Sequence, residues 1–423
     1  MSGSRDSALG LYVSIPFCRS KCTYCNFASG VYPSSEHARY VARIVEDMAA
    51  AGAWAAGVGV DLPRRVDTVY LGGGTPSLLA PALVARLFGA IRAEFELDPG
   101  AEITVECAPG QLADATLDAL AAAGVNRVSL GVQSLIDGEA RASGRLHTQA
   151  IVLEDLRRLR AAGIANLNVD LIAGLAGQTF ATWEASLVVL MDSGVPHASV
   201  YMLEVDEDSR LGRELLAGGA RYHAASVPSD DAIARMYTRA IERLADAGLA
   251  QYEISNFARS DFQSRHNLRY WKRRPYLGLG LDASSMLREA LPARDCSSER
   301  AEGVGSGYVL RTTATDDLKA YMEGSQPVET AWLSPARQHE EAWFLGLRLN
   351  AGVALEALER EFGRRPVARA WEVAERLVEA GLLASDGRSV WLTPRGQLLS
   401  NDVFQEFLGL EAEEREMSAK AWS

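Results

Sequence analysis

The chain has 423 residues, of which 48% are hydrophobic and 23% are charged. These values lie near those of ordinary globular proteins, so they exclude a fibrous chain and wholesale disorder, and the length predicts two or three domains. A formal net charge of -12 makes general binding to nucleic acid or anionic lipid unfavourable. Neither a signal-peptide pattern nor an apolar run of bilayer length is found, so we expect a cytoplasmic protein without an integral membrane segment.

The first half of the chain alternates short β-branched runs with longer segments of helical period, which is typical of consecutive βα units around a parallel sheet. The expected strands are 11–15, 66–71, 102–106, 127–132, 166–172 and 198–205. The expected helices between them are 36–53, 78–94, 113–123, 148–162 and 179–192. Six units predict an α/β fold with a partial (β/α)6 barrel, since a closed barrel usually has eight.

The second half is less regular. A helix is expected at 229–247, a short strand at 251–255, and a mobile loop with an incidental exposed thiol, Cys296, at about 288–307. A composition change at 324–330 marks a linker. The last hundred residues combine helical segments with a hairpin and a final helix, which resembles a winged helix. Acidic residues on these helices favour packing against the main domain over DNA binding.

The predicted organisation has four parts. They are an N-terminal tail at 1–9, a barrel domain at 10–260, a connecting segment at 261–325 and a smaller α+β winged-helix-like domain at 326–423.

Three of the five cysteines form a C-x3-C-x2-C cluster at Cys18, Cys22 and Cys25, directly after the first expected strand. This position is the carboxyl end of a βα strand, where functional groups of such folds gather. Three closely spaced thiolates favour an iron–sulfur cluster, because structural zinc would usually have a fourth Cys or His at finger-like spacing. A zinc-binding regulator remains the alternative.

Other polar or flexible residues follow the next strand ends. They are the glycine-rich stretch GGGTPS at 72–77, then Glu106, Gln133 and Asp170. Each of them alone is typical of a turn or a solvated loop. Because the carboxyl ends of parallel strands share one edge, their common placement predicts a ligand site, where the glycines permit close backbone approach.

The chain resembles radical S-adenosylmethionine (SAM) enzymes of the oxygen-independent coproporphyrinogen III oxidase family over most of its length, in the stretches YVSIPFCRSKCTYCNF, LGGGTPS, TVECAPG, RVSLGVQS, GRLHT and NVDLIAGLAGQT. The resemblance implies a radical SAM barrel in which Cys18, Cys22 and Cys25 hold a 4Fe-4S cluster and its open iron chelates SAM. It also implies that SAM is bound by Tyr12, Tyr24, Gly73, Gly74, Thr75, Glu106, Gln133, Arg145 and Asp170. From the residues alone, Tyr12 and Tyr24 would equally suit a hydrophobic core.

Two features divide this family. The first is a further cysteine, two positions after the third, in the decarboxylating members, where this chain has Phe27. The second is the sequence HNLRYW at residues 266–271, which is similar to the HNxxYW motif of heme chaperones in the family. The resemblance therefore implies a chaperone that binds heme, with His266 as an axial ligand, and transfers it to an acceptor hemoprotein, which could be respiratory. Oxidative decarboxylation of coproporphyrinogen III is the alternative, so enzymatic activity stays open.

The same resemblance is compatible with a homodimer and with peripheral placement at a membrane through a partner, and it leaves the electron donor unknown. Some positions depart from the family pattern. Residues 278–284 lack the histidine of a GxGxxAH segment, Ala176 stands where proline is usual, and Cys107 follows Glu106. The missing histidine bears on the pocket, while the other two changes are conservative.

Overall fold

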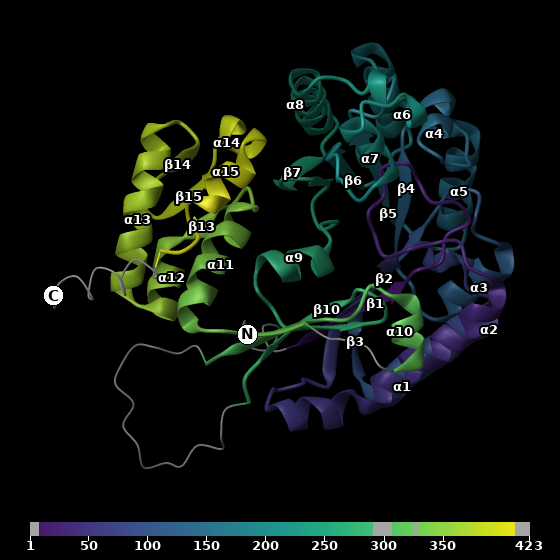
Figure 1. The fold of residues 1–423 in the computed structure, drawn as a ribbon, viewed down its shortest axis with the longest axis horizontal. Coiled ribbons are helices and arrows are strands. Elements are labelled where there is room, and N and C mark those ends of the chain that lie inside the picture. Colours follow the sequence, from purple (N-terminus) through teal and green to yellow (C-terminus); the bar gives the residue numbers. More distant parts are fainter. Residues whose placement is uncertain (1–7, 291–306, 325–328, 411–423) are drawn as a thin grey trace.

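The computed structural model describes residues 8–290, 307–324 and 329–410. Within these ranges the chain forms a large mixed sheet with helices on its outer face, and a smaller helical module with its own sheet (Figure 1). The expected loop at 288–307, with Cys296, and the middle of the expected linker at 324–330 lie largely outside the described residues. No helix in these ranges is both long and apolar enough to cross a bilayer.

Six parallel strands in chain order form the centre of the large sheet. They are β1 (Leu9–Ile15), β2 (Arg65–Gly73), β3 (Glu96–Cys107), β4 (Arg127–Gln133), β5 (Asn166–Ala173) and β6 (His197–Met202). The connecting elements are α1 (Ser34–Val58), η1 (Pro76–Leu78), α2 (Pro81–Glu94), α3 (Asp114–Ala122), α4 (Asp137–Ala142), α5 (Gln149–Ala161) and α6 (Phe180–Asp192). The strands are largely buried on both faces, as parallel strands under helices should be. The predicted partial α/β barrel is confirmed.

The sheet is wider than the sequence predicted and has 12 strands among the described residues. Beyond β1 it continues through β9 (Tyr276–Leu279), β10 (Ser284–Arg288), β11 (Val309–Thr313) and β12 (Glu329–Leu333). Beyond β6 it continues through β8 (Asn256–Ala258) and β7 (Ala250–Glu253). These additions are antiparallel to their neighbours, except that β9 runs parallel to β1. The segment 261–325 therefore extends the sheet of the barrel.

Helix α9 (Arg265–Trp271), which carries HNLRYW, lies against the amino ends of β1 and β2. Ser264 begins the helix, because its hydroxyl accepts a hydrogen bond from the Asn267 amide. Buried Arg269 pairs with Asp67 and donates to the carbonyl oxygens of Ala8 and Pro275, each at 2.8 Å. The helix therefore covers the end of the barrel opposite the cysteine loop. The other helices of this part are α7 (Arg210–Leu216), η2 (Arg221–Ser226), α8 (Asp230–Asp246) and α10 (Leu318–Glu323).

The C-terminal module has a separate hydrophobic core, in which the rings of Trp343 and Phe407 stack with centroids 4.9 Å apart. Its elements are α11 (Pro335–Leu347), β13 (Val353–Ala354), α12 (Leu355–Phe362), α13 (Arg364–Glu379), β14 (Leu383–Ser385), β15 (Ser389–Leu392), α14 (Pro394–Leu398) and α15 (Ser400–Gln405). The three strands pair antiparallel in the order β13-β15-β14, which agrees with the winged-helix-like prediction. Figure 1 shows this module beside the barrel, where ion pairs from Arg273 to Glu361 and from Arg311 to Glu341 join the two parts.

Candidate functional site

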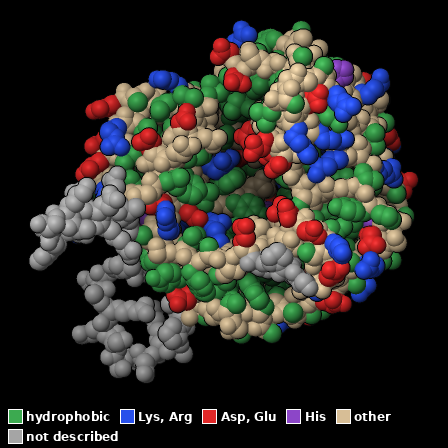
Figure 2. Space-filling view, viewed as in Figure 1, with side chains coloured by type: hydrophobic (Ala, Val, Ile, Leu, Met, Phe, Trp, Pro, Cys, Tyr) green, Lys and Arg blue, Asp and Glu red, His purple; other side chains and the backbone are tan. Residues whose placement is uncertain are grey.

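A cavity of about 1060 Å³ lies at the carboxyl ends of the barrel strands and reaches the C-terminal module. Figure 2 shows it as a hollow near the middle of the visible face, with acidic and basic side chains around its mouth. The structure brings most of the predicted site residues to its wall, namely Cys18, Cys22, Tyr24, Cys25, Gly73, Gly74, Thr75, Glu106, Gln133, Arg145 and Asp170. Tyr12 and His266 do not line it.

The three clustered cysteines are free thiols on the loop that follows β1, and all of them line the cavity. Burial raises the pKa of the Cys18 thiol, while the hydroxyls of Thr75, 3.8 Å from its sulfur, and Ser29 oppose that rise. Among the described residues, no three His, Cys, Asp or Glu side chains converge as ligands of a single metal ion. A 4Fe-4S cluster instead takes one thiolate on each of several irons, so three unpaired thiols around one cavity fit that group.

The glycine-rich turn after β2 joins the start of the cysteine loop. The Gly74 amide donates to the Ile15 carbonyl at 2.9 Å, and the Thr75 amide donates to the Phe17 carbonyl at 2.8 Å. A Cβ atom added to Gly74 would lie 2.8 Å from the Ile15 carbonyl oxygen and 2.9 Å from the backbone nitrogen and oxygen of Phe17. Gly74 is therefore required for close approach to the chain's own backbone, whereas the sequence suggested close approach to a ligand.

Two partly buried carboxylates lie near the carboxyl ends of neighbouring strands, Glu106 on β3 and Asp170 on β5. The Tyr70 hydroxyl donates to Glu106 Oε1 at 2.7 Å, and the Gly73 amide donates to Oε2 at 3.2 Å. Burial raises the pKa of Glu106 to about 7, although these two donors act against the rise. Asp170 accepts hydrogen bonds from Ser129 at 3.0 Å and Asn168 at 2.7 Å, and burial raises its pKa as well.

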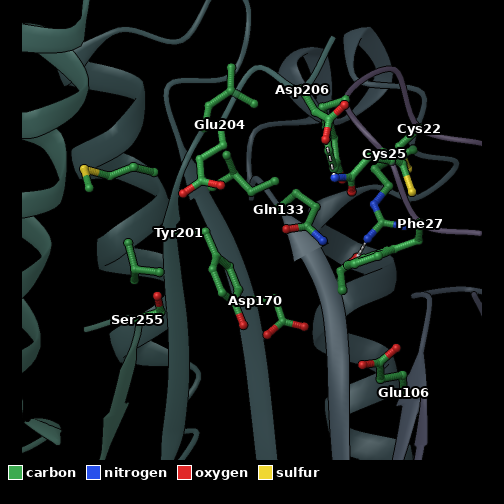
Figure 3. A pocket seen from close by; sticks show the side chains of 18 of the residues that line it. Cys22, Cys25, Phe27, Glu106, Gln133, Asp170, Tyr201, Glu204, Asp206 and Ser255 are labelled. Atoms are coloured by element: carbon green, nitrogen blue, oxygen red, sulfur yellow. Dashed lines mark hydrogen bonds between the residues drawn. The ribbon is translucent and has the colours of Figure 1, made fainter. Parts of the chain in front are cut away.

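Several buried polar atoms at the cavity have no hydrogen-bond partner within the described part of the chain. They are the Tyr24 hydroxyl, Gln133 Oε1 and Arg145 Nε. Figure 3 shows Gln133 and Asp170 between the cysteines on one side and Tyr201 on the other. Unsatisfied buried groups are rare in native proteins, and a polar ligand would satisfy these. Cationic Arg145 and the two carboxylates suit SAM, which carries a carboxylate, an ammonium group and ribose hydroxyls.

His266 lies near the opposite end of the barrel with a side chain that is 1% exposed. Its Nδ1 is 2.9 Å from the Thr68 hydroxyl and its Nε2 is 2.9 Å from the Tyr270 hydroxyl. Burial lowers its pKa to about 3. Both ring nitrogens are therefore engaged, and neither is open to a heme iron in this arrangement. Tyr12 packs nearby, with its ring 6.0 Å from that of Tyr70.

Several cavity residues were not predicted from the sequence. Tyr201 lies near the end of β6, and Glu204, Val205 and Asp206 follow the strand. Asp206 accepts a hydrogen bond from Asn26 of the cysteine loop at 2.7 Å. The strand-end rule could have found these residues, because β6 ends at the same edge as its neighbours. Arg348 and residues 398–402 come from the C-terminal module, and no motif in the sequence indicated that they would line the site.

The partial barrel, the cysteine loop and the strand-end site define a radical SAM protein. Residues 12–189 match the family model of the Radical SAM superfamily, and residues 333–399 match that of the HemN C-terminal domain. The chain is 31% identical to heme chaperone HemW of Lactococcus lactis subsp. lactis over 94% of this chain and 96% of that protein. It is 32% identical to heme chaperone HemW of Bacillus subtilis over 94% of this chain and 98% of that protein. The chain therefore belongs to the HemW family.

The structure also resembles that of coproporphyrinogen III oxidase (HemN) from Escherichia coli, a radical SAM enzyme. The TM-score is 0.78, with 22% sequence identity over 95% of this chain and 90% of the other. At this identity the similarity establishes a shared fold, and it does not extend the activity of HemN to this chain.

Proposed function

We propose that the protein is a heme chaperone that binds heme, a 4Fe-4S cluster and SAM, and that it transfers heme to an acceptor hemoprotein. The observation that carries this proposal is its nearly full-length similarity to proteins named heme chaperone HemW. The sequence HNLRYW at 266–271 and the absence of a cysteine at Phe27 point the same way. We further propose that the protein acts in the cytoplasm and reaches a membrane only through its acceptor.

The residues around the cavity would divide the binding of the two cofactors. Cys18, Cys22 and Cys25 would hold the cluster, which when bound supplies an electron to SAM. The Arg145 guanidinium would meet the SAM carboxylate, and Glu106 and Asp170 would accept hydrogen bonds from its ammonium or ribose groups. Tyr24, Gln133 and the backbone at 73–75 would complete this site, with Tyr12 as a supporting residue behind Tyr70.

For heme, His266 is the proposed axial ligand, because imidazole is the common protein ligand of heme iron. Ligation through Nε2 would replace the contact with the Tyr270 hydroxyl. His266 therefore has to exchange a buried hydrogen bond for an iron bond, and the helix α9 has to open locally.

One preparation tests the function. The protein is reconstituted anaerobically with iron and sulfide, titrated with heme by absorption in the Soret region, mixed with a heme-free b-type cytochrome, and assayed for decarboxylation of coproporphyrinogen III. We expect stoichiometric heme binding, transfer to the cytochrome and no decarboxylated product. Robust decarboxylation would instead establish the oxidase alternative. Zinc in place of iron and sulfide would support the regulator alternative.

A further inference from the structure

We infer that Arg348 binds a carboxylate of the ligand in the cavity and that Trp271 of the HNLRYW motif holds Arg348 in place. This inference rests on the proposed function, since it assigns the propionate end of a bound heme. It does not depend on which residue ligates the iron.

Arg348 directly follows α11 of the C-terminal module and lines the cavity beside Ile254 and Ser255. Its backbone carbonyl accepts a hydrogen bond from the Ile254 amide at 3.1 Å, which fixes the residue at the junction of the two parts. The guanidinium carbon lies 4.3 Å from the centroid of the Trp271 ring, a cation–π contact. Trp271 itself does not line the cavity. Its contact with Arg348 therefore connects the HNLRYW motif to the cavity wall.

The donors of Arg348 are not consumed by the protein. Its Nε is buried without a hydrogen-bond partner among the described residues, and no carboxylate in the same ranges lies within ion-pair distance of it. The buried carboxylate of Glu253 interacts electrostatically with Arg348 without forming an ion pair. Its Oε1 accepts hydrogen bonds from the Ser255 amide and from Asn256, and its Oε2 has no hydrogen-bond partner among the described residues. The cation–π contact with Trp271 uses no N–H group of the guanidinium, so these donors stay available for a carboxylate.

The other basic side chains of the cavity have different partners. Lys21 donates to the Phe27 carbonyl at 3.1 Å. Arg145, at the cysteine end, donates to the Gly131 carbonyl and is the proposed partner of the SAM carboxylate. The acidic residues Glu204 and Asp206 lie on the wall that follows β6 (Figure 3), where they would repel an anionic group. We therefore expect a bound ligand to orient its carboxylates toward Arg348.

The remaining wall of the cavity suits an apolar body. Phe27, Leu146, Tyr201, Val205 and Leu399 all line it and expose large parts of their side chains. Exposed apolar surface of this kind marks a binding site. An apolar surface beside the guanidinium of Arg348 fits a flat hydrophobic ligand that carries carboxylates, and heme has this chemistry.

The test compares heme with heme dimethyl ester, in which both propionates are blocked, on the full chain with its cluster assembled. We expect Arg348→Gln to weaken heme binding about 10- to 100-fold, as expected for loss of charge-assisted hydrogen bonds, and to leave dimethyl ester binding unchanged. Trp271→Leu should produce a smaller loss of the same selectivity. Arg273→Gln is the matched control, because Arg273 stacks on Phe362 at 5.1 Å in the same interface but does not line the cavity.

Three results separate the possible failures. Equal weakening of both ligands in Arg348→Gln would show that Arg348 only supports the packing of the module, and it would overturn the inference. Unchanged binding of both ligands would overturn it as well. Failure of the wild-type protein to bind either ligand would instead overturn the proposed function.

Discussion

The hydrogen bond from Tyr70 to Glu106 offers a sharp test of the proposed SAM site. Tyr70→Phe removes the donor to Glu106 Oε1 and leaves the Gly73 amide as the donor to Oε2. A hydrogen bond to a charged group contributes about 1.5–3 kcal/mol, so its loss should raise the pKa of Glu106 by about 1–2 units. Because that pKa already lies at about 7, the carboxylate of the variant should be largely protonated at neutral pH.

This shift predicts a pH-dependent loss of SAM affinity, because the ionised carboxylate is the better hydrogen-bond acceptor. At pH 7 the ionised fraction falls from about a half to between about a tenth and a hundredth, which weakens binding about 5- to 50-fold. At pH 9 the two proteins should differ by about twofold or less. Isothermal titration of SAM under anaerobic conditions measures both values. The control is Tyr276→Phe, since Tyr276 does not line the cavity.

A loss of equal size at pH 7 and pH 9 would refute the reasoning, because it would assign Tyr70 a steric role with no effect on the ionisation of Glu106. Unchanged affinity at both values would remove Glu106 from the SAM site.

Three further predictions concern the cluster and the barrel. Changing the three clustered cysteines together to serine should abolish bound iron and sulfide, while Cys107→Ser on β3 should retain both; iron retention in the triple variant would contradict the ligand assignment. Gly74→Ala should lower the cluster content and the melting temperature, because the added Cβ would contact the backbone of Ile15 and Phe17. Gly89→Ala is the control, because its Cβ would contact nothing within 4 Å. Equal iron loading of the two variants would contradict the role given to the turn at Gly74. As the pH is lowered from 6.5, the free energy of unfolding should decrease by about 1.4 kcal/mol per pH unit for each buried neutral histidine. The cause is that the unfolded chain takes up a proton which His266 in the folded protein, with a pKa of about 3, does not bind. His266→Gln should reduce the slope of urea-derived stability between pH 6 and 4 by about that amount, and an unchanged slope would show that His266 titrates normally.

The barrel and the position of the cysteine loop could be predicted because the order of parallel strands in the sequence fixes where their ends lie in the fold. Strands with parallel order end at one edge, so Cys18, Glu106 and Asp170 had to meet there despite their separation along the chain. Periodic burial made the strands recognisable. The first five strands are as long as predicted or longer, whereas β6 ends at Met202, three residues before the predicted end.

The strands that widen the sheet could not be predicted by the same rule. β9 to β12 are short, and their pairing partners are chosen by tertiary contacts that no local period encodes. The burial of His266 and Arg269 in α9 was equally hidden, because a seven-residue helix rich in polar groups reads as a surface segment. The Ser264 cap was the one local signal for that helix.

The contribution of Arg348 was hidden for a different reason. It lies in a module that folds around its own core, and only the docking of that module brings the residue to the cavity. Domain docking depends on complementary surfaces, which a single sequence does not display.

The interface between the barrel and the C-terminal module affects how a bulky ligand enters and leaves the cavity. Described contacts across this interface include ion pairs such as Arg273 to Glu361, cation–π contacts and backbone hydrogen bonds. Polar domain interfaces of this kind separate more readily than a continuous hydrophobic core, and salt weakens their ion pairs. We therefore expect the entry and release of a ligand of the cavity to depend on ionic strength, because salt weakens the contacts that hold the module against the barrel.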